Sequence, residues 1–519
     1  MKNKIVFILL FVFSINLVAG SQPKFSIKPM GSAVVNVASH GIEIASYRVT
    51  NNTKITRTLN FSPLNGVIQN TLLPGSCQYP FTLSQGNSCL LNLTVTDENS
   101  DRNTVSSGPI VCKTTSANDN TPSPFLCSQP ASSDRLTIIK PESSSGQLQC
   151  WGKNDFGQVG VDTGGVRVNP PQPVSQLSTD IKAVATGTSH TCALTNQGGV
   201  KCWGSNSMGQ LGVSSIEETN IPQEVTGLQS GVKAISAGSE HNCALLNGGE
   251  VKCWGGNGFG QLGRGYISGS DYMPETTLPL AGKAIKVTSG GLGVCVLLEN
   301  GKVQCWGDAS FGQLGVPPVG GGGQAIPSPQ APVDLAAPAV NLDSGSRFSC
   351  ALLNSGKIMC WGRNNQGQLG NTTELGNFTY TPVEVENLNG LPILISTGSE
   401  FACAVFLDRT AQCWGANRRG ELGNTVNSGT NNPNPTPLTV TGLTGISQLR
   451  AAAVSTCAIL TTGGLQCWGQ NENGELGNPT NDGTKNANVS PLNVTGLSSG
   501  VLRLFNNSHS FTVCAITSA

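Results

Sequence analysis

The chain has 519 residues, more than one ordinary domain, and its 30 Lys plus Arg residues balance its 30 Asp plus Glu residues. This balance excludes a global electrostatic attraction to nucleic acid or to an anionic membrane, so we expect no nucleic-acid partner. The 65 Gly residues are typical of many short strands joined by tight turns.

Residues 1–20 predict a signal peptide. Lys2 and Lys4 form a basic start, residues 5–13 form an apolar run, and residues 17–21 supply small side chains for cleavage. The alternative, an uncleaved membrane anchor, requires a longer apolar run. Ser21 stands where a lipoprotein signal needs Cys, so we expect no lipid anchor. We therefore expect a secreted, periplasmic or extracellular protein without membrane insertion after cleavage.

Residues 22–112 predict a small β-sandwich. Strand-like alternation at residues 34–36, 45–51 and 91–95 is separated by clusters of Asn, Gly and Pro. The segments 47–51 and 82–89 resemble the immunoglobulin-like modules of exported bacterial proteins. Residues 113–134, which are rich in Ser, Thr, Asn and Pro, predict a linker to a larger domain at 135–519.

The larger domain is predicted to be a repeat array. The word Cys-Trp-Gly occurs seven times at intervals of 51 to 55 residues, and a Gly-(Gln/Glu)-(Leu/Val)-Gly element follows each copy. A period near 50 with four short strands in each unit indicates an all-β, seven-bladed β-propeller. The repeated tryptophans, which we expect to be structural, are Trp151, Trp203, Trp254, Trp306, Trp361, Trp414 and Trp468.

The cysteine spacing predicts a disulfide across a hairpin in six of the repeats. The two Cys of each pair are ten residues apart, with a three-residue turn between them that calls for Gly at its last position. Arg409 takes that position in the fifth hairpin, so we expect a strained or different turn there. The expected pairs are Cys192–Cys202, Cys243–Cys253, Cys295–Cys305, Cys350–Cys360, Cys403–Cys413 and Cys457–Cys467.

Cys150 and Cys514 lack a partner at this spacing, one at each end of the array. Their pairing predicts a ring in which the N-terminal strand completes the last blade, which removes exposed sheet edges. Structural zinc is the competing interpretation, but these sites usually use close Cys pairs, and an exported chain meets an oxidising compartment. Sequence permits three connectivities in the N-terminal region, and proximity favours Cys77–Cys89 and Cys112–Cys127.

The repeat also carries a family resemblance. The pattern Gly-x-x-His-x-Cys-Ala-Leu, then Gly-x-Val-x-Cys-Trp-Gly-x-Asn-x-x-Gly-Gln-Leu-Gly, resembles the regulator-of-chromosome-condensation repeat over residues 146–519. The resemblance implies a seven-bladed propeller, a fold that a secreted bacterial inhibitor of β-lactamases also uses. Cysteines at the hairpin positions depart from the nuclear founder of the family and favour an exported branch.

No catalytic, cofactor or metal motif stands out, and we expect His190 and His241 to be structural. The function favoured by the sequence is an exported, monomeric, non-enzymatic scaffold that binds an unidentified protein through loops. The longest of these loops include 264–273 and 317–329, the latter with its Gly320–Gly323 run. Alternatives are a guanine-nucleotide exchange factor for a small GTPase, which the founder family implies, a secreted enzyme inhibitor, and an enzyme.

Overall fold

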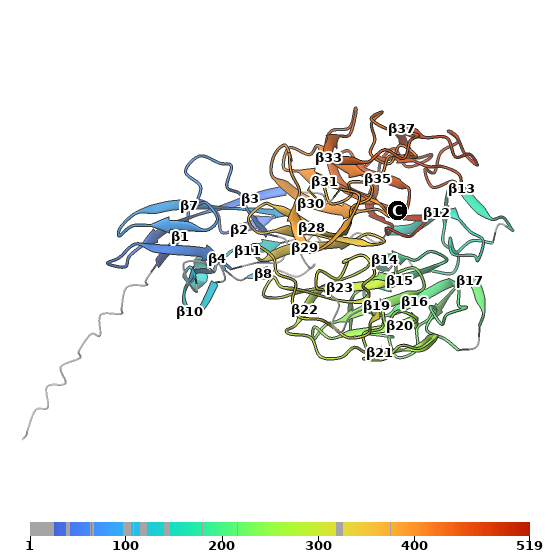
Figure 1. The fold of residues 1–519 in the computed structure, drawn as a ribbon, viewed down its shortest axis with the longest axis horizontal. Helices are drawn as coiled ribbons and strands as arrows, with labels where there is room; N and C mark the ends of the chain where they lie inside the picture. Colours follow the sequence, from blue (N-terminus) through green and yellow to red (C-terminus); the bar gives the residue numbers. More distant parts are fainter. Residues whose placement is uncertain are drawn as a thin grey trace, which may run out of the picture.

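The computed structural model is almost entirely β-structure (Figure 1). It describes residues 25–518 except 38–41, 63, 65–66, 97–104, 107, 115–121, 140–145, 163, 178–179, 215, 318–324 and 374. The predicted signal peptide lies outside the described residues. Within the described ranges, no helix has the length and apolar character needed to cross a membrane.

The N-terminal unit consists of two four-stranded antiparallel sheets and a small third sheet around one apolar core. That core contains Phe25, Tyr47, Phe61, Leu93 and Val111, all nearly inaccessible to solvent. The first sheet has the order β1 (Phe25–Pro29), β3 (Ile42–Asn51), β7 (Ser88–Thr96), β5 (Val67–Gln69). The second has the order β10 (Pro122–Ser128), β9 (Val111–Thr114), β4 (Arg57–Phe61), β6 (Phe81–Leu83).

The linker predicted for 113–134 and the boundaries at 112 and 135 differ from the structure. Strand β10 pairs with β9 inside the second sheet, and a short 3-10 turn follows at Ser132–Asp134. Then β11 (Thr137–Ile139) pairs with β2 (Val34–Asn36) and β8 (Val105–Ser106). The N-terminal unit therefore extends to Ile139, because backbone pairing with β9 and β2 outweighs the loop-like composition of this segment.

From residue 146 onward, the described strands form seven four-stranded sheets. Six consist of consecutive strands, and we call them repeat sheets 1 to 6. Sheets 1 to 3 are β14 (Ile181–Thr186), β15 (His190–Thr195), β16 (Val200–Ser205), β17 (Glu218–Glu224); β18 (Val232–Ala237), β19 (His241–Leu246), β20 (Val251–Gly256), β21 (Ser270–Thr276); and β22 (Ala284–Ser289), β23 (Gly293–Leu298), β24 (Val303–Asp308), β25 (Ala325–Ile326).

Repeat sheets 4 to 6 follow the same plan. They are β26 (Ala339–Ser344), β27 (Phe348–Leu353), β28 (Ile358–Arg363), β29 (Phe378–Glu384); β30 (Pro392–Thr397), β31 (Phe401–Phe406), β32 (Ala411–Gly415), β33 (Asn434–Thr439); and β34 (Ile446–Ala451), β35 (Ser455–Leu460), β36 (Leu465–Gly469), β37 (Asn488–Asn493). The fourth strand of most repeat sheets contains Pro, for example Pro222, Pro274 and Pro382. Proline lacks an N–H donor, so these outer edges are protected against further strand pairing.

The seventh sheet, which we call the closing sheet, joins both ends of the repeat region. Its order is β13 (Arg167–Pro173), β12 (Gly146–Lys153), β39 (Thr512–Ser518), β38 (Val501–Phe505). The first strands of successive sheets contact one another from β14 through to β38, and β38 contacts β14 in turn. These contacts form a complete circuit.

The hairpin turns follow the Gly rule, with one departure. Gly198, Gly249, Gly301 and Gly356 all have positive φ at the last turn position. Arg409 has a φ of 65° at the same position, so the fifth hairpin keeps the turn and places a non-Gly residue in the left-handed region. The turn of the fifth hairpin thus has the same geometry as the others, and the expected strain lies in the left-handed backbone conformation of Arg409.

The N-terminal unit docks on the end of the repeat region that carries the turns between second and third strands. Asn354, in the β27–β28 turn, accepts a hydrogen bond from the Gln69 N–H at 3.2 Å and donates to the Phe61 carbonyl at 3.3 Å. Ile68 belongs to the same apolar cluster as Leu391 and Ile393. Figure 1 shows the unit beside the sheets that contain β28 and β30. The opposite end carries the loops between first and second strands.

The closing sheet generates a stability prediction. The Cys150–Cys514 disulfide closes 364 residues, whereas Cys243–Cys253 closes 10. On the chain-entropy model these loops correspond to about 6 and about 3 kcal/mol respectively. Replacing Cys150 and Cys514 by Ala should lower the melting temperature more than replacing Cys243 and Cys253. Calorimetry of the two variants checks this, and an equal or larger loss from the Cys243–Cys253 variant would contradict it.

The fifth hairpin generates a second prediction. Arg409→Gly should raise the free energy of unfolding by about 1 kcal/mol, because a non-Gly residue in the left-handed region costs about that much. The Arg409 side chain also donates to the Ile446 carbonyl at 3.5 Å, and loss of its contacts offsets part of this gain. Guanidinium unfolding of the oxidised protein measures the change. Gly356→Ala, at the matching position of the fourth hairpin, should be destabilising.

Candidate functional site

The repeated tryptophans connect neighbouring sheets. Each buried indole Nε1–H donates a hydrogen bond of 2.9–3.0 Å to the backbone carbonyl of the Gln or Glu in the preceding sheet's Gly-(Gln/Glu)-(Leu/Val)-Gly element. The pairs are Trp203–Gln158, Trp254–Gln210, Trp306–Gln261, Trp361–Gln313, Trp414–Gln368, Trp468–Glu421 and Trp151–Glu475. The last pair links repeat sheet 6 to the closing sheet and completes the circuit.

The cysteines lie at the centres of the sheets, on the second and third strands. Paired positions are directly opposite in the register, and each Cα–Cα distance in the repeat region is 4.0–4.1 Å. The nine disulfides are Cys77–Cys89, Cys112–Cys127, Cys150–Cys514, Cys192–Cys202, Cys243–Cys253, Cys295–Cys305, Cys350–Cys360, Cys403–Cys413 and Cys457–Cys467. These side chains are cross-links and perform no binding chemistry.

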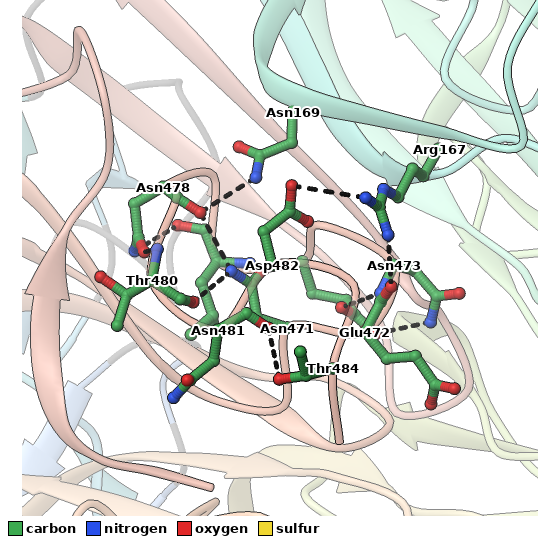
Figure 2. Close-up of polar contacts among 12 residues, drawn as sticks. Arg167, Asn169, Asn471, Glu472, Asn473, Asn478, Thr480, Asn481, Asp482 and Thr484 are labelled. Carbon is green, nitrogen blue, oxygen red and sulfur yellow. Dashed lines mark hydrogen bonds and ion pairs between the residues drawn. The ribbon is translucent and has the colours of Figure 1, made fainter. Parts of the chain in front are cut away.

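A polar network seals the junction between repeat sheet 6 and the closing sheet (Figure 2). Asn169 on β13 donates to the Asn478 carbonyl at 2.9 Å, and Arg167 lies 3.8 Å from the Asp482 carboxylate. Asn471 organises the opposing loop by donating to the carbonyls of Asn478 and Thr480. The cluster joins segments about 300 residues apart and connects repeat sheet 6 to the closing sheet.

Two of the repeated elements contain Glu where the others contain Gln. Glu421 and Glu475 are buried, and each carboxylate accepts the backbone N–H two residues earlier, of Arg419 at 2.7 Å and of Asn473 at 2.8 Å. Burial raises the pKa of each Glu from 4.5 to about 7. The folded state therefore binds their protons more tightly than the unfolded chain does.

A pH prediction follows from this pair. The pKa of both Glu side chains is higher in the folded state than in the unfolded chain. The free energy of unfolding of the protein therefore falls as the pH rises from 4.5 to about 7, by up to about 3 kcal/mol for each Glu. Glu421→Gln with Glu475→Gln should therefore stabilise the protein at pH 8 and leave it almost unchanged at pH 4. Melting curves at both values measure this difference. The converse change, Gln210→Glu, should destabilise the protein at pH 8 only.

The histidines are structural. His190 and His241 are fully buried, and burial lowers their pKa values to about 4 and about 3. His190 Nε2 lies 3.0 Å from the Asn242 side-chain oxygen. Both rings pack against glycines, Gly187 and Gly238, where a Cβ atom would lie within 2.2 Å of the ring. Both imidazoles are therefore neutral near pH 7 and tightly enclosed by the neighbouring backbone, in agreement with the expected structural position.

The loop between β38 and β39 crosses the axis around which the sheets lie. Asn507 donates to the Ala237 carbonyl in repeat sheet 2, and Ser508 Oγ donates to the Ser344 carbonyl in sheet 4 at 2.8 Å. The Ser510 carbonyl accepts the Ala453 N–H in sheet 6. One loop thus bonds to three separate sheets. His509, in the same loop, lines a hollow of about 300 Å³ at the end opposite the N-terminal unit.

The predicted binding loop 264–273 is held rigidly by Arg264, whose side chain is 5 % exposed. Its guanidinium donates to the carbonyls of Cys253 and Met273 at 2.6 and 3.0 Å, and forms ion pairs with Asp271 at 3.0 Å and Glu275 at 3.4 Å. The hydrogen bonds and ion pairs of Arg264 are thus made within the protein, and they hold the backbone of the loop in place.

The same loop and the start of β21 display apolar side chains to solvent. Tyr266 is 46 %, Ile267 53 %, Tyr272 37 % and Met273 45 % exposed. Together they form a group that we call the Tyr266 patch. Apolar and aromatic side chains on a fixed backbone are the residues that protein interfaces use as anchors. The other predicted loop, 317–329, has residues 318–324 outside the described part of the chain, so the Gly320–Gly323 run has no structural account.

Sequence reasoning missed a second cluster, at the rim of the hollow. The guanidinium carbons of Arg347 and Arg363 lie 4.7 and 5.4 Å from the centre of the Phe311 ring. Phe311 in turn makes an edge contact with Phe378 at 6.3 Å, and Phe378 makes one with Tyr380 at 5.6 Å. These residues come from different repeats and share no motif, so no local signal marks them.

Comparisons with known proteins identify the family. A model of the RCC1-like domain matches residues 142–440. The chain belongs to the RCC1-like domain family. The human E3 ubiquitin-protein ligase HERC2 (Homo sapiens) is 30 % identical over 326 residues, which cover 61 % of this chain and 6 % of that protein. The secretion-regulating guanine nucleotide exchange factor of Mus musculus is 31 % identical over 279 residues, 48 % of this chain and 58 % of that protein.

The solved structures support the same RCC1-like fold. Prp20p from Saccharomyces cerevisiae superposes with a TM-score of 0.64 at 20 % identity, covering 72 % of this chain and 92 % of that one. The matched region spans less than two thirds of both relatives named above. The shared feature is therefore the RCC1-like propeller fold with its blade sheets.

Proposed function

We propose that the protein is an exported binding scaffold without catalytic activity, which captures a partner protein through loops at the rim of a seven-bladed propeller. In this proposal, the seven sheets are blades of a closed ring, and the N-terminal unit is an immunoglobulin-like sandwich. The circuit of first-strand contacts and the mixed composition of the closing sheet support the ring. Two packed antiparallel sheets around one core support the sandwich.

The observation that carries the binding role is the Tyr266 patch on its arginine-fixed loop. Each of the four apolar side chains is more than a third exposed, and apolar surface in contact with water costs free energy that a covering partner would recover. The loop backbone is already ordered by Arg264, so binding a partner costs little conformational entropy. Such preorganised aromatic anchors favour tight binding of another protein.

Disulfides support the exported location. Nine cross-links account for all 18 cysteines, and disulfides persist in oxidising compartments and are rare in the cytosol. They also weigh against the alternative of guanine-nucleotide exchange on a cytosolic GTPase, although one relative carries that activity in its name. An enzyme-inhibitor role would be one special case of partner capture.

The test is affinity capture with the oxidised full-length protein from the extracellular fraction of its own organism. Tyr272→Ser with Met273→Ser should weaken binding of the captured partner at least tenfold, since interface anchors contribute about 2 kcal/mol or more. Ile55→Ser with Leu72→Ser, two exposed apolar residues of the N-terminal unit, is the matched control and should bind normally. Equal affinity of all three proteins would refute the role of the patch.

A second measurement separates the alternative. The oxidised protein should leave the nucleotide release rate of purified small GTPases unchanged at micromolar concentration. Acceleration of release, retained in the Tyr272→Ser/Met273→Ser variant, would favour nucleotide exchange over the scaffold.

A further inference from the structure

The hollow opposite the N-terminal unit is lined by Arg347, which forms no ion pair with the acidic side chains that the structure describes. Arg347 is exposed on the loop between β26 and β27, at the edge of the hollow. Its guanidinium carbon lies over the Phe311 ring, 4.7 Å from the ring centre. Stacking on an aromatic face fixes the guanidinium plane and leaves its in-plane N–H donors available for an acceptor.

The carboxylates beside Arg347 are already occupied. Glu400 accepts from Arg363 at 3.0 Å with one oxygen and from Arg418 at 2.6 Å with the other. Asp308 accepts from the Ser310 N–H at 3.0 Å and from Gln313 Nε2 at 2.9 Å. These acids accept from other donors, so the guanidinium donors of Arg347 stay available, although the two arginines and two acids that line the hollow balance in charge.

The shape of the hollow suits an inserted side chain rather than a flat contact. It encloses about 300 Å³, and its lining includes Arg347, Arg363, Glu400, His509 and Leu292. That space holds several waters or one side chain with its backbone. Phe311, against which Arg347 lies, begins an edge-to-face row with Phe378 and Tyr380, and all three rings are half-buried. A partner that fills the hollow would also cover these rings.

We propose that Arg347, stacked on Phe311, is a recognition site for the carboxylate of an Asp or Glu side chain on the partner protein. The inference rests on the proposed scaffold function and specifies the chemistry of one partner contact. A carboxylate accepts two parallel hydrogen bonds from a guanidinium. An Arg side chain that an aromatic ring already holds in place presents these two N–H donors with little further loss of side-chain entropy. Arg363 and Arg418 add positive potential, while Glu400 keeps them in place.

The test uses two labelled peptides, Gly-Ser-Gly-Glu-Glu-Gly-Ser-Gly and its counterpart with Gln in place of both Glu. Fluorescence anisotropy at 50 mM salt should show at least tenfold tighter binding of the Glu peptide to the full-length oxidised protein. Arg347→Ala should abolish this preference, because it removes a charge-assisted pair worth about tenfold or more in affinity. Phe311→Leu should reduce it severalfold, since the guanidinium loses its support.

Lys302→Glu is the matched control. Lys302 is an exposed cation in the β23–β24 turn, at the opposite end of the sheets, and its reversal changes the net charge without touching the hollow. The control should retain the Glu preference, and an unchanged melting temperature of Arg347→Ala should show that the fold is intact. Equal binding of the two peptides, or equal loss in Lys302→Glu, would overturn the proposal.

Two further outcomes define its limits. Displacement of the Glu peptide by free glutarate at an equal concentration would assign the site to small dicarboxylates and overturn the protein-partner assignment. If the Arg347 variant keeps the peptide preference while the Tyr272→Ser/Met273→Ser variant loses the captured partner, this inference fails and the scaffold function stands.

Discussion

The hydrogen bond from each tryptophan indole to a carbonyl of the preceding sheet is the interaction on which the architecture depends. An indole has one donor, which requires an acceptor when it is buried, so the large ring is fixed in orientation as well as in place. The accepting carbonyl lies in a turn whose glycines approach the neighbouring indole, as Gly212 does Trp254. The Cys-Trp-Gly motif therefore supplies the donor, and the Gly-(Gln/Glu)-(Leu/Val)-Gly motif the acceptor, of one hydrogen bond between neighbouring sheets, which we call the joint.

This joint explains why the sheets tolerate different loops. Repeat sheet 3 has Ala309 where most repeats have Asn, and its fourth strand is only two residues long. Nevertheless, Trp306 and Trp361 still make both of its inter-sheet bonds. The joints use the Gly-(Gln/Glu)-(Leu/Val)-Gly element that follows the third strand, and the disulfides lie within the sheets. Only the residues between that element and the fourth strand are therefore free to vary. The Arg264 loop occupies that position.

Much of the repeat region could be predicted because the determining interactions recur. Cys spacing fixed the hairpins, the orphan pair Cys150 and Cys514 indicated how the ends meet, and Gly198 with its equivalents marked the turns. The segment 113–134 was assigned wrongly because its composition is typical of a loop. The proximity of Cys112 and Cys127 was the available signal, since a disulfide at that separation brings β9 and β10 side by side.

The candidate site was only partly accessible to sequence reasoning. Loop length pointed to 264–273, but the role of Arg264 depends on carbonyls that only the folded backbone places around it. Arg347 and Phe311 are 36 residues apart on different repeats, and nothing in either repeat distinguishes them. Their meeting results from the angle between adjacent sheets, which is set by the Trp361 joint rather than by local sequence.

The closing sheet has a consequence for how the protein is made. Strands β12 and β13 leave the ribosome early, yet the edge of β12 has no partner until β39 arrives, more than 350 residues later. Six internal hairpins can form and oxidise locally as they appear, because their contacts are close in sequence. The pairing of β12 with β39 is slow by comparison, because the two strands are far apart in sequence. Until it occurs, the edge of β12 stays unpaired. Removal of β39 would thus leave the edge of β12 permanently without its partner strand.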